Sequence, residues 1–121
     1  MSIQDKIDFC IAEGEKLTGA RVYYREDWEC YYFDVAGKFF GLLSNHSEKG
    51  SFITLKNLPG RNEVLRSTYK SIVPGYYTNK AHWNSIDVTT DEVSQDMLAA
   101  LIETSYQLVV AKLPKKIRDT I

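Results

Sequence analysis

The sequence is poor in the residues that mark unusual protein classes. Among its 121 residues are only two cysteines, three prolines and two histidines. Cys10 and Cys30 form neither a C-x-x-C nor a C-x-x-H pattern, so their spacing favours neither a disulfide framework nor a zinc ribbon. We therefore interpret both cysteines as small buried hydrophobic residues.

Long hydrophobic runs are also absent. No apolar stretch approaches the roughly 18 residues that a membrane span requires, and residues 1–11 alternate charged with apolar side chains, unlike the core of a signal peptide. Hydrophobic residues make up 44% of the chain and charged residues 26%, which are ordinary globular values. We expect a cytoplasmic protein without membrane contact, folded as one domain over residues 1–121.

Catalytic and metal-binding patterns are missing as well. His46 and His82 lie far apart in the sequence and belong to no catalytic triad or nucleophile elbow. Neither has a second ligand at a spacing typical of metal sites, and the glycines form no GxGxxG or Walker loop. The sequence thus predicts no enzyme activity, no cofactor and no metal site.

Charge is balanced overall but unevenly distributed. The chain carries 15 basic and 16 acidic residues, a net charge of −1, which argues against a surface that attracts nucleic acid everywhere. Residues 54–86, however, hold five basic groups and one acidic group, with aromatic residues between them. This segment either forms an anion-binding face or is positive only because carboxylates are scarce in it.

Periodicity predicts helices and strands in the first half of the chain. Ser2 and Asp5 have the spacing of a helix cap, and the helix should end near Thr18-Gly19. Its apolar face would carry Ile3, Ile7, Cys10, Ile11 and Leu17. Strands are predicted over 30–35, 39–43 and 51–56, with a turn at Ala36-Gly37, a loop over 45–50 that contains His46, and a further short strand over 21–25.

The second half is predicted to alternate helix, strand pair and helix. Pro59-Gly60 favours the start of a helix with Val64, Leu65 and Thr68 on one side, ending before Ser71. Strands follow over 71–73 and 83–88, and a long helix runs from about residue 94 until Pro114 stops it. Carboxylates before this helix are interpreted as caps for the positive end of its dipole: Asp87, Asp91, Glu92 and Asp96. The order predicts an α+β fold with two layers, an antiparallel sheet covered by helices on one face.

The segment over 74–83, PGYYTNKAHW, concentrates aromatic and polar residues between two strands. Asn79 and Lys80 could bind phosphates or a partner backbone while Tyr76 and Trp83 stack on a ligand. Alternatively, the same residues build a turn and fill one face of the sheet. The sequence alone leaves both interpretations open.

This segment, DVAGKFFGLL (34–43), Leu55-Lys56 and LIETSYQLVVAKLPKK (101–116) together resemble the MmcQ/YjbR family of small bacterial proteins. The resemblance spans nearly the whole chain. It implies an α-β(3)-α-β(2)-α fold of the secretion-chaperone-like, double-wing kind, and a DNA-binding function without catalysis. The family pattern matches at Gly37, Lys38, Phe40, Lys56, Pro74, Gly75, Tyr76, Asn79, Lys80, His82, Trp83, Ser105, Tyr106, Leu113, Pro114 and Lys115.

Two departures from the family pattern bear on function. Tyr77-Thr78 stands where the family commonly has His-Met, and Ala81 where it often has a basic residue, which removes one expected phosphate contact. We therefore predict a nucleic-acid-binding protein with DNA as the expected partner, whose contacts are Lys38, Lys56, Arg61, Arg66, Tyr76, Asn79, Lys80, His82, Trp83 and Lys115. The alternative is a protein-interaction or chaperone-like module that binds a protein partner, or a second copy as a homodimer, through the sheet face and the 74–83 loop.

Overall fold

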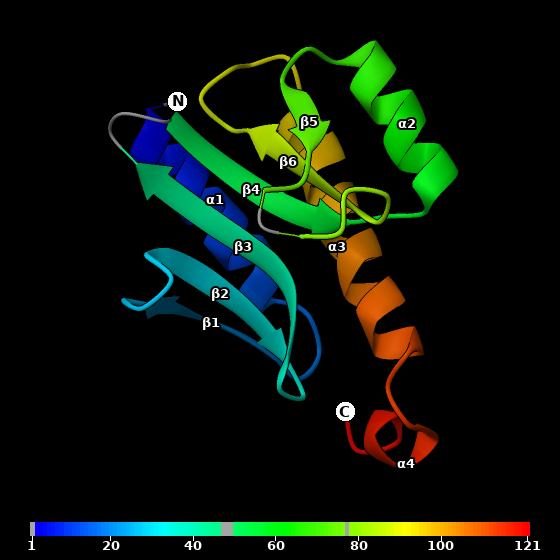
Figure 1. Ribbon diagram of the computed structural model, residues 1–121. Helices are drawn as coiled ribbons and strands as arrows, with labels where there is room; N and C mark the ends of the chain where they lie inside the picture. The colour runs from blue at the N-terminus through cyan, green and yellow to red at the C-terminus, as the bar shows by residue number, and fades with distance from the viewer. Residues whose placement is uncertain (1, 47–49, 77) are drawn as a thin grey trace.

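The computed structural model describes residues 2–46, 50–76 and 78–121, which form four helices and one six-stranded antiparallel sheet (Figure 1). In chain order the elements are α1 (Ile3–Glu15), β1 (Ala20–Arg25), β2 (Cys30–Val35), β3 (Lys38–His46), β4 (Gly50–Lys56), α2 (Pro59–Thr68), β5 (Ile72–Pro74), β6 (Trp83–Asp87), α3 (Gln95–Ala111) and α4 (Lys115–Arg118). The strands lie in the order β1-β2-β3-β4-β6-β5. The α+β fold with an antiparallel sheet is confirmed.

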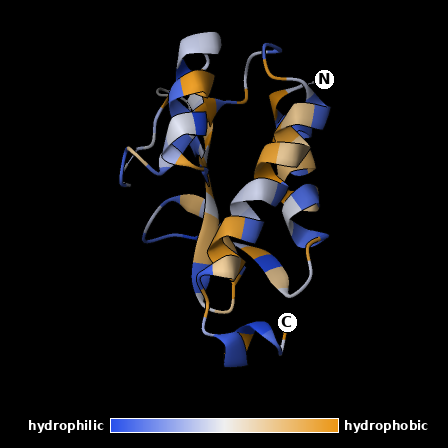
Figure 2. Cartoon of the chain, turned by 90° about the vertical axis from the view of Figure 1, so that its right-hand side faces the viewer, coloured by the Kyte–Doolittle hydropathy of each residue, from blue (hydrophilic) through white to orange (hydrophobic). Residues whose placement is uncertain are grey.

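The long helices lie on one side of the sheet. α1 packs against β1, α3 packs against β3 and β4, and the two helices contact each other (Figure 1). α2 packs against β5 and β6 at the opposite end of the sheet from β1. Figure 2 shows hydrophobic residues along α3, whereas the short α4 is almost entirely hydrophilic. Within the described part of the chain, no helix covers the sheet face opposite α1 and α3 (Figure 1).

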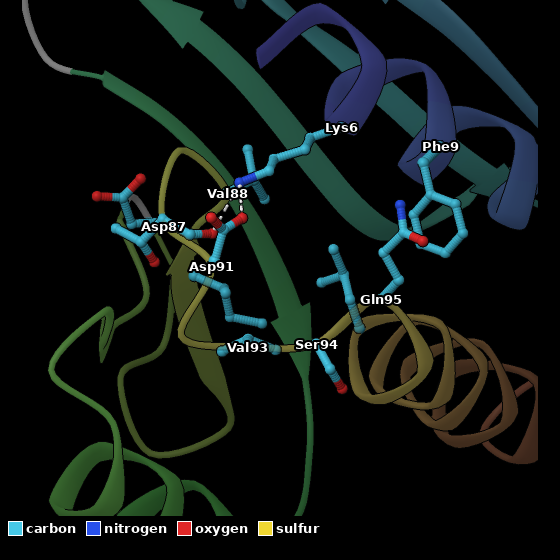
Figure 3. A pocket seen from close by; sticks show the side chains of 11 residues that line it. Lys6, Phe9, Asp87, Val88, Asp91, Val93, Ser94 and Gln95 are labelled. Atoms are coloured by element: carbon cyan, nitrogen blue, oxygen red, sulfur yellow. Dashed lines mark hydrogen bonds and ion pairs between the residues drawn. The ribbon is translucent and has the colours of Figure 1, made fainter. Parts of the chain in front are cut away.

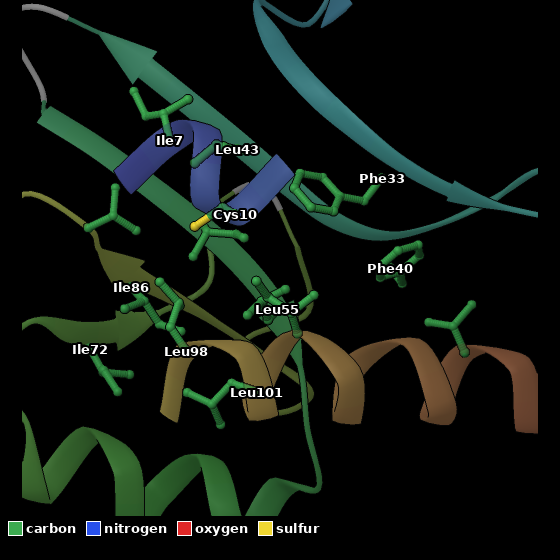
Figure 4. Packing of buried hydrophobic residues seen from close by; sticks show 14 of the residues in the cluster. Ile7, Cys10, Phe33, Phe40, Leu43, Leu55, Ile72, Ile86, Leu98 and Leu101 are labelled. Carbon is green, nitrogen blue, oxygen red and sulfur yellow. The ribbon is translucent and has the colours of Figure 1, made fainter. Parts of the chain in front are cut away.

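The core fills the space between the sheet and these helices. Phe33 and Phe40, from β2 and β3, are fully buried with their ring centroids 5.7 Å apart, edge to face. Ile7 and Cys10 of α1 and Leu98 of α3 pack against the same cluster (Figure 4). Burial of Cys10 agrees with its interpretation as a small hydrophobic residue.

The β2–β3 hairpin turns where the sequence predicts. Ala36 and Gly37 both have positive φ angles, 52° and 82°, and Val35 pairs with Lys38 across a two-residue loop. Such a loop with both central residues left-handed matches the twist of the paired strands. The register shifts between Phe33 and Asp34, so β3 carries a bulge at this end.

Several boundaries differ from the prediction. α1 has the predicted capping box but ends at Glu15, and Ile3, placed on its apolar face by periodicity, is exposed. β1 confirms the further short strand predicted over 21–25, so four strands precede α2, where the family resemblance implied three. The predicted loop over 45–50 is wrong at its ends, because Asn45 and His46 belong to β3; residues 47–49 lie outside the described part of the chain.

Other differences concern single side chains. Val64 lies on the exposed side of α2, while Asn62 and Leu65 are buried. Only Asp96 of the four carboxylates lies in the first turn of α3, which is capped by Ser94 instead. Among the described helices none is long and apolar enough to cross a bilayer, and the same residues contain no group of three or more potential metal ligands.

Candidate functional site

The helix-free face of the sheet carries a continuous set of aromatic rings. Phe33 of β2 and Leu43 of β3 are buried against the helices, and residues paired with them in adjacent strands point to the same side. Because side chains alternate along a strand, the residues next to them in sequence point to the opposite, helix-free face. We call the set on the helix-free face the aromatic row; it consists of Tyr23 (β1), Trp28 (the β1–β2 turn), Tyr32 (β2), Phe39 (β3) and Trp83 (β6).

Each ring of the aromatic row touches the next. Ring centroids are 5.5 Å apart for Tyr23 and Tyr32, and 5.8 Å apart for Tyr32 and Phe39. Trp28 lies edge to face against both Tyr32 and Phe39, at 5.7 and 6.1 Å. Phe39 contacts Trp83 at 4.9 Å, so the row runs from β1 to the start of β6.

The outer members of the row face solvent. Tyr23 is 37% exposed and Trp28 is 46% exposed, whereas Tyr32 beneath them is 7% exposed. Large apolar residues gathered on one exposed face are uncommon in a monomeric soluble protein and mark interaction surfaces. Their contacts hold the rings in fixed positions, which lowers the entropy lost when a ligand binds.

Two arginines of β1 lie on the row and are already paired. Arg21 lies over the ring of Tyr23, and Arg25 over Trp28, with guanidinium-to-centroid distances of 5.0 and 4.5 Å. Arg21 also forms an ion pair with the buried Asp34 and Arg25 with Asp27, which raise the pKa of each arginine. These cations add flat guanidinium surface but little net charge.

The opposite end of the row carries unpaired positive charge. The Nζ atom of Lys56 lies 5.9 Å from the ring centroid of Trp83. Partial burial and the nearby Lys112 ammonium lower the pKa of Lys56. Within residues 2–46, 50–76 and 78–121, neither Lys56 nor Lys112 has an ion pair. We call these two lysines the basic end of the row.

The 74–83 loop folds over the neighbouring part of the helix-free face. Tyr76 packs against Phe52 of β4, with ring centroids 5.3 Å apart, and its backbone N–H donates to Ser85 Oγ at 3.0 Å. A Cβ on Gly75 would lie 2.4 Å from Thr78 Oγ1 and 2.8 Å from Trp83 Cβ. Glycine is therefore required here by close packing.

The side chains of Asn79 and Lys80 form hydrogen bonds within this loop. Asn79 Oδ1 accepts from the backbone N–H groups of Ala81 and His82, at 2.9 and 3.3 Å. Lys80 Nζ donates to the carbonyl oxygen of Gly75 at 2.7 Å. These contacts support the interpretation of the loop as a turn, with Asn79 and Lys80 serving the loop itself.

Arg66, predicted as a phosphate contact, instead ties α2 to this loop. Its Nε donates to Asn84 Oδ1 at 2.6 Å, and its Nη2 donates to the carbonyl oxygens of Lys80 and Trp83. The guanidinium thus satisfies backbone acceptors at the start of β6. It holds Trp83 at the end of the aromatic row, which makes it a positioning residue for the face.

The remaining predicted contacts do not converge. Lys38 is exposed at the β2–β3 turn and Arg61 is exposed in α2. Lys115 of α4 pairs with Asp119, the residue that follows this helix, at 2.8 Å. His82 lies in the turn before β6, and its carbonyl oxygen accepts from the backbone N–H of Asn57. Of the predicted set, only Lys56 and Trp83 come together on the aromatic row.

Sequence reasoning missed four members of the row: Tyr23, Trp28, Tyr32 and Phe39. A signal was present in the strands over 21–25 and 30–35. Alternation along them places Tyr23 and Tyr32 on the face opposite Val22 and Phe33, and a sheet covered on one side leaves that face open. The motif-centred prediction did not use this alternation.

A small cavity on the helix side is a weaker candidate. It has a volume of about 240 Å³ and lies between α1, the end of β6 and the start of α3 (Figure 3). Lys6 reaches across from α1 and donates to the Thr90 carbonyl oxygen at 3.1 Å and to Asp91 Oδ1 at 2.6 Å. The lysine is thus already paired, and the cavity is below the roughly 300 Å³ of typical ligand pockets.

Comparison with known proteins identifies related chains. A YjbR family model matches residues 16–108. The uncharacterized protein YbdF of Escherichia coli O157:H7 is 39% identical over 84 residues, spanning 69% of this chain and 67% of YbdF. The uncharacterized protein YjbR of Escherichia coli strain K12 is 25% identical over 118 residues, spanning 98% of this chain and 95% of that protein. The crystal structure of Deinococcus radiodurans protein DR2400, a DUF419 domain, has a TM-score of 0.81 and 27% identity, covering 98% of this chain and 86% of that one.

Proposed function

The chain belongs to the YjbR family, and we propose that it is a nucleic-acid-binding protein that contacts its ligand through the aromatic row and the basic end, without catalysing a reaction. The observation that carries the proposal is the position of Lys56 and Lys112. Lys56 lies beside Trp83 at the end of an exposed aromatic surface and interacts electrostatically with Lys112, and neither lysine has a carboxylate paired to it among the described residues.

A phosphate group has the negative charge that would complement the two lysines. Partial burial, together with repulsion from the Lys112 ammonium, lowers the pKa of Lys56, so its charged form is disfavoured in the unliganded protein. An anion bound between them removes that repulsion and makes charge-assisted hydrogen bonds to both. Because Trp83 adjoins Lys56, the base next to such a phosphate has an aromatic surface within reach.

The test is a fluorescence-anisotropy titration of labelled DNA at about 50 and 200 mM salt. We expect wild-type binding to weaken with salt, and the Lys56→Ala/Lys112→Ala variant to show a log–log slope shallower by about 1 to 2 units. The control variant, Lys16→Ala/Lys70→Ala, loses the same charge away from the row and should keep the wild-type slope. Binding at low salt that both variants lose equally would reject the basic end.

A protein-interaction module is the second candidate function. It is favoured by the pairing of Arg21 with Asp34 and of Arg25 with Asp27, which leaves most of the row nearly neutral. Aromatic residues with arginine beside them are common at protein interfaces. This candidate predicts that DNA does not bind at low salt and that Trp28→Ala weakens a protein complex instead.

A further inference from the structure

We infer that the ligand of the aromatic row is an unpaired nucleic-acid strand whose bases stack on the rings, an inference that rests on the proposed function. The row offers flat π surfaces on the helix-free face of the sheet. The sheet itself is open, with β1 at one edge and β5 at the other (Figure 1). This aromatic surface, more than the two lysines, is what favours a single strand over a duplex.

Base pairing hides the surface that an aromatic ring binds. In a duplex the faces of the bases are covered by their neighbours in the stack, and only edges and phosphates reach a protein. In a single strand the bases can splay out and stack on aromatic side chains or arginine planes. Tyr23 and Trp28 are the most exposed rings of the row, and Arg25 lies over Trp28 at 4.5 Å.

The distribution of charge agrees with a strand held mainly by stacking. Among the described residues, the row has two paired arginines at its β1 end and an unpaired Lys56 at its Trp83 end. A duplex bound through its backbone needs cations spread over several phosphates, whereas a stacked strand needs one or two anchoring contacts. We therefore expect one phosphate between Lys56 and Lys112 and bases extending toward β1.

Two neighbouring tyrosines provide a matched test. Tyr23 belongs to the row, whereas Tyr24 points to the other face and contacts Tyr31; both are exposed on β1. The experiment titrates wild type, Tyr23→Ala and Tyr24→Ala with a labelled mixed-sequence single strand, and with the duplex of the same sequence, at about 50 mM salt. Thermal unfolding of each variant confirms that it is folded.

The expected result is preferential binding of the single strand and a Kd raised about tenfold in Tyr23→Ala, with little change in Tyr24→Ala. Both tryptophans of the chain, Trp28 and Trp83, lie in the row, so the single strand should also quench the intrinsic fluorescence of the protein.

The outcomes separate the two proposals. Duplex binding equal to or stronger than single-strand binding, or equal effects of the two tyrosine variants, overturns the stacking inference and leaves nucleic-acid binding in place. No binding of either form overturns both proposals.

Discussion

At the residue scale, the lack of a side chain at Gly75 allows its backbone to pack directly against Trp83. The backbone of Gly75 lies against Trp83, where its N–H donates to the Trp83 carbonyl oxygen at 2.9 Å. A side chain at position 75 would overlap Thr78 and Trp83. The proline-glycine pair at the start of the motif is therefore a packing requirement for the end of the aromatic row.

We predict that Gly75→Ala lowers the free energy of unfolding by about 1 to 3 kcal/mol, because overpacking a fixed contact forces the loop to move. Urea denaturation followed by tryptophan fluorescence measures the change. Gly60→Ala is the control, since a Cβ at Gly60 in α2 would meet nothing within 4 Å. Equal destabilisation by both substitutions would contradict the steric explanation.

Single residues also show which contacts could be predicted from the sequence and which could not. Trp83 and Lys56 were predicted and do lie together, because the motif places them on paired strands. Arg66 and Asn79 were predicted as ligand contacts; in the structure Arg66 donates to the Lys80 carbonyl oxygen, and Asn79 accepts from the Ala81 backbone N–H. Residue type cannot distinguish a donor aimed at a ligand from one aimed at a carbonyl, because that choice depends on tertiary packing.

At the scale of elements, Ser105 joins α3 to two strands at the β3 bulge. Its hydroxyl donates to the Phe40 carbonyl oxygen at 2.5 Å and accepts from the Lys56 backbone N–H at 2.8 Å. Both groups belong to strand segments whose ladder is interrupted by the bulge. One buried hydroxyl thus replaces missing sheet hydrogen bonds and also fixes the backbone of Lys56.

Ser105→Ala should destabilise the protein by about 2 kcal/mol or more, since it leaves a donor and an acceptor unsatisfied in the interior. The measurement is the free energy of unfolding in urea, with Ser67→Ala as the control. Ser67 is exposed and bonds only within α2, so its loss should change stability by less than about 0.5 kcal/mol. A change of that small size in Ser105→Ala would show that water replaces the hydroxyl.

Glu92 ties the start of β5 to the segment before α3. Its carboxylate accepts from the Ser71 hydroxyl at 2.6 Å and from the Ser71 backbone N–H at 2.8 Å, and these hydrogen bonds hold its pKa below 4.5. A lowered pKa in the folded state contributes stability above pH 4.5, which is lost as pH falls through the folded value.

We therefore predict that Glu92→Gln lowers the urea midpoint at pH 7 and that the difference from wild type shrinks below pH 4.5. Urea unfolding curves at pH 7, 5 and 3 provide the measurement. Asp8→Asn, an exposed change on α1, is the control for a general effect of carboxylate removal. A difference that stays constant down to pH 3 would contradict a role for the Glu92 charge.

Most elements were predictable from local patterns, and the exceptions have physical causes. The capping box of Ser2 and the turn at Ala36-Gly37 are encoded within a few residues, and both are confirmed. The exposure of Val64 was not predictable from α2 alone, because Asn62 on the buried side of that helix donates to the carbonyl oxygens of Asn57 and of Ala81 in the 74–83 loop. Local propensity contains no information on such contacts.

At the scale of the whole molecule, the buried thiol of Cys10 makes the free energy of unfolding depend on pH. Burial, reinforced by Glu13, raises the pKa of its thiol from 9.0 to about 12. The unfolded chain therefore releases this proton at a lower pH than the folded protein does. The resulting contribution to stability is complete below pH 9 and is lost progressively as pH rises toward 12.

We predict a fall in the free energy of unfolding above pH 9 of up to about 1.4 kcal/mol per pH unit from this group. Urea unfolding of wild type and Cys10→Ala at pH 7.5 and 10.5 gives the measurement. The decline with pH should be smaller in Cys10→Ala, although that variant starts from lower stability. Identical declines in the two proteins would rule out the thiol as the source.

The edge strand β1 also determines how separate molecules meet. An antiparallel pairing of two copies of β1, centred on Tyr23, would place Arg21 of each directly opposite Arg25 of the other. Like charges facing each other across strands oppose pairing, and a shift by one residue would turn the tyrosines to the wrong side. Even with their own carboxylate partners, the two arginines that lie over the aromatic rings therefore disfavour this symmetric edge-to-edge pairing of two copies of β1.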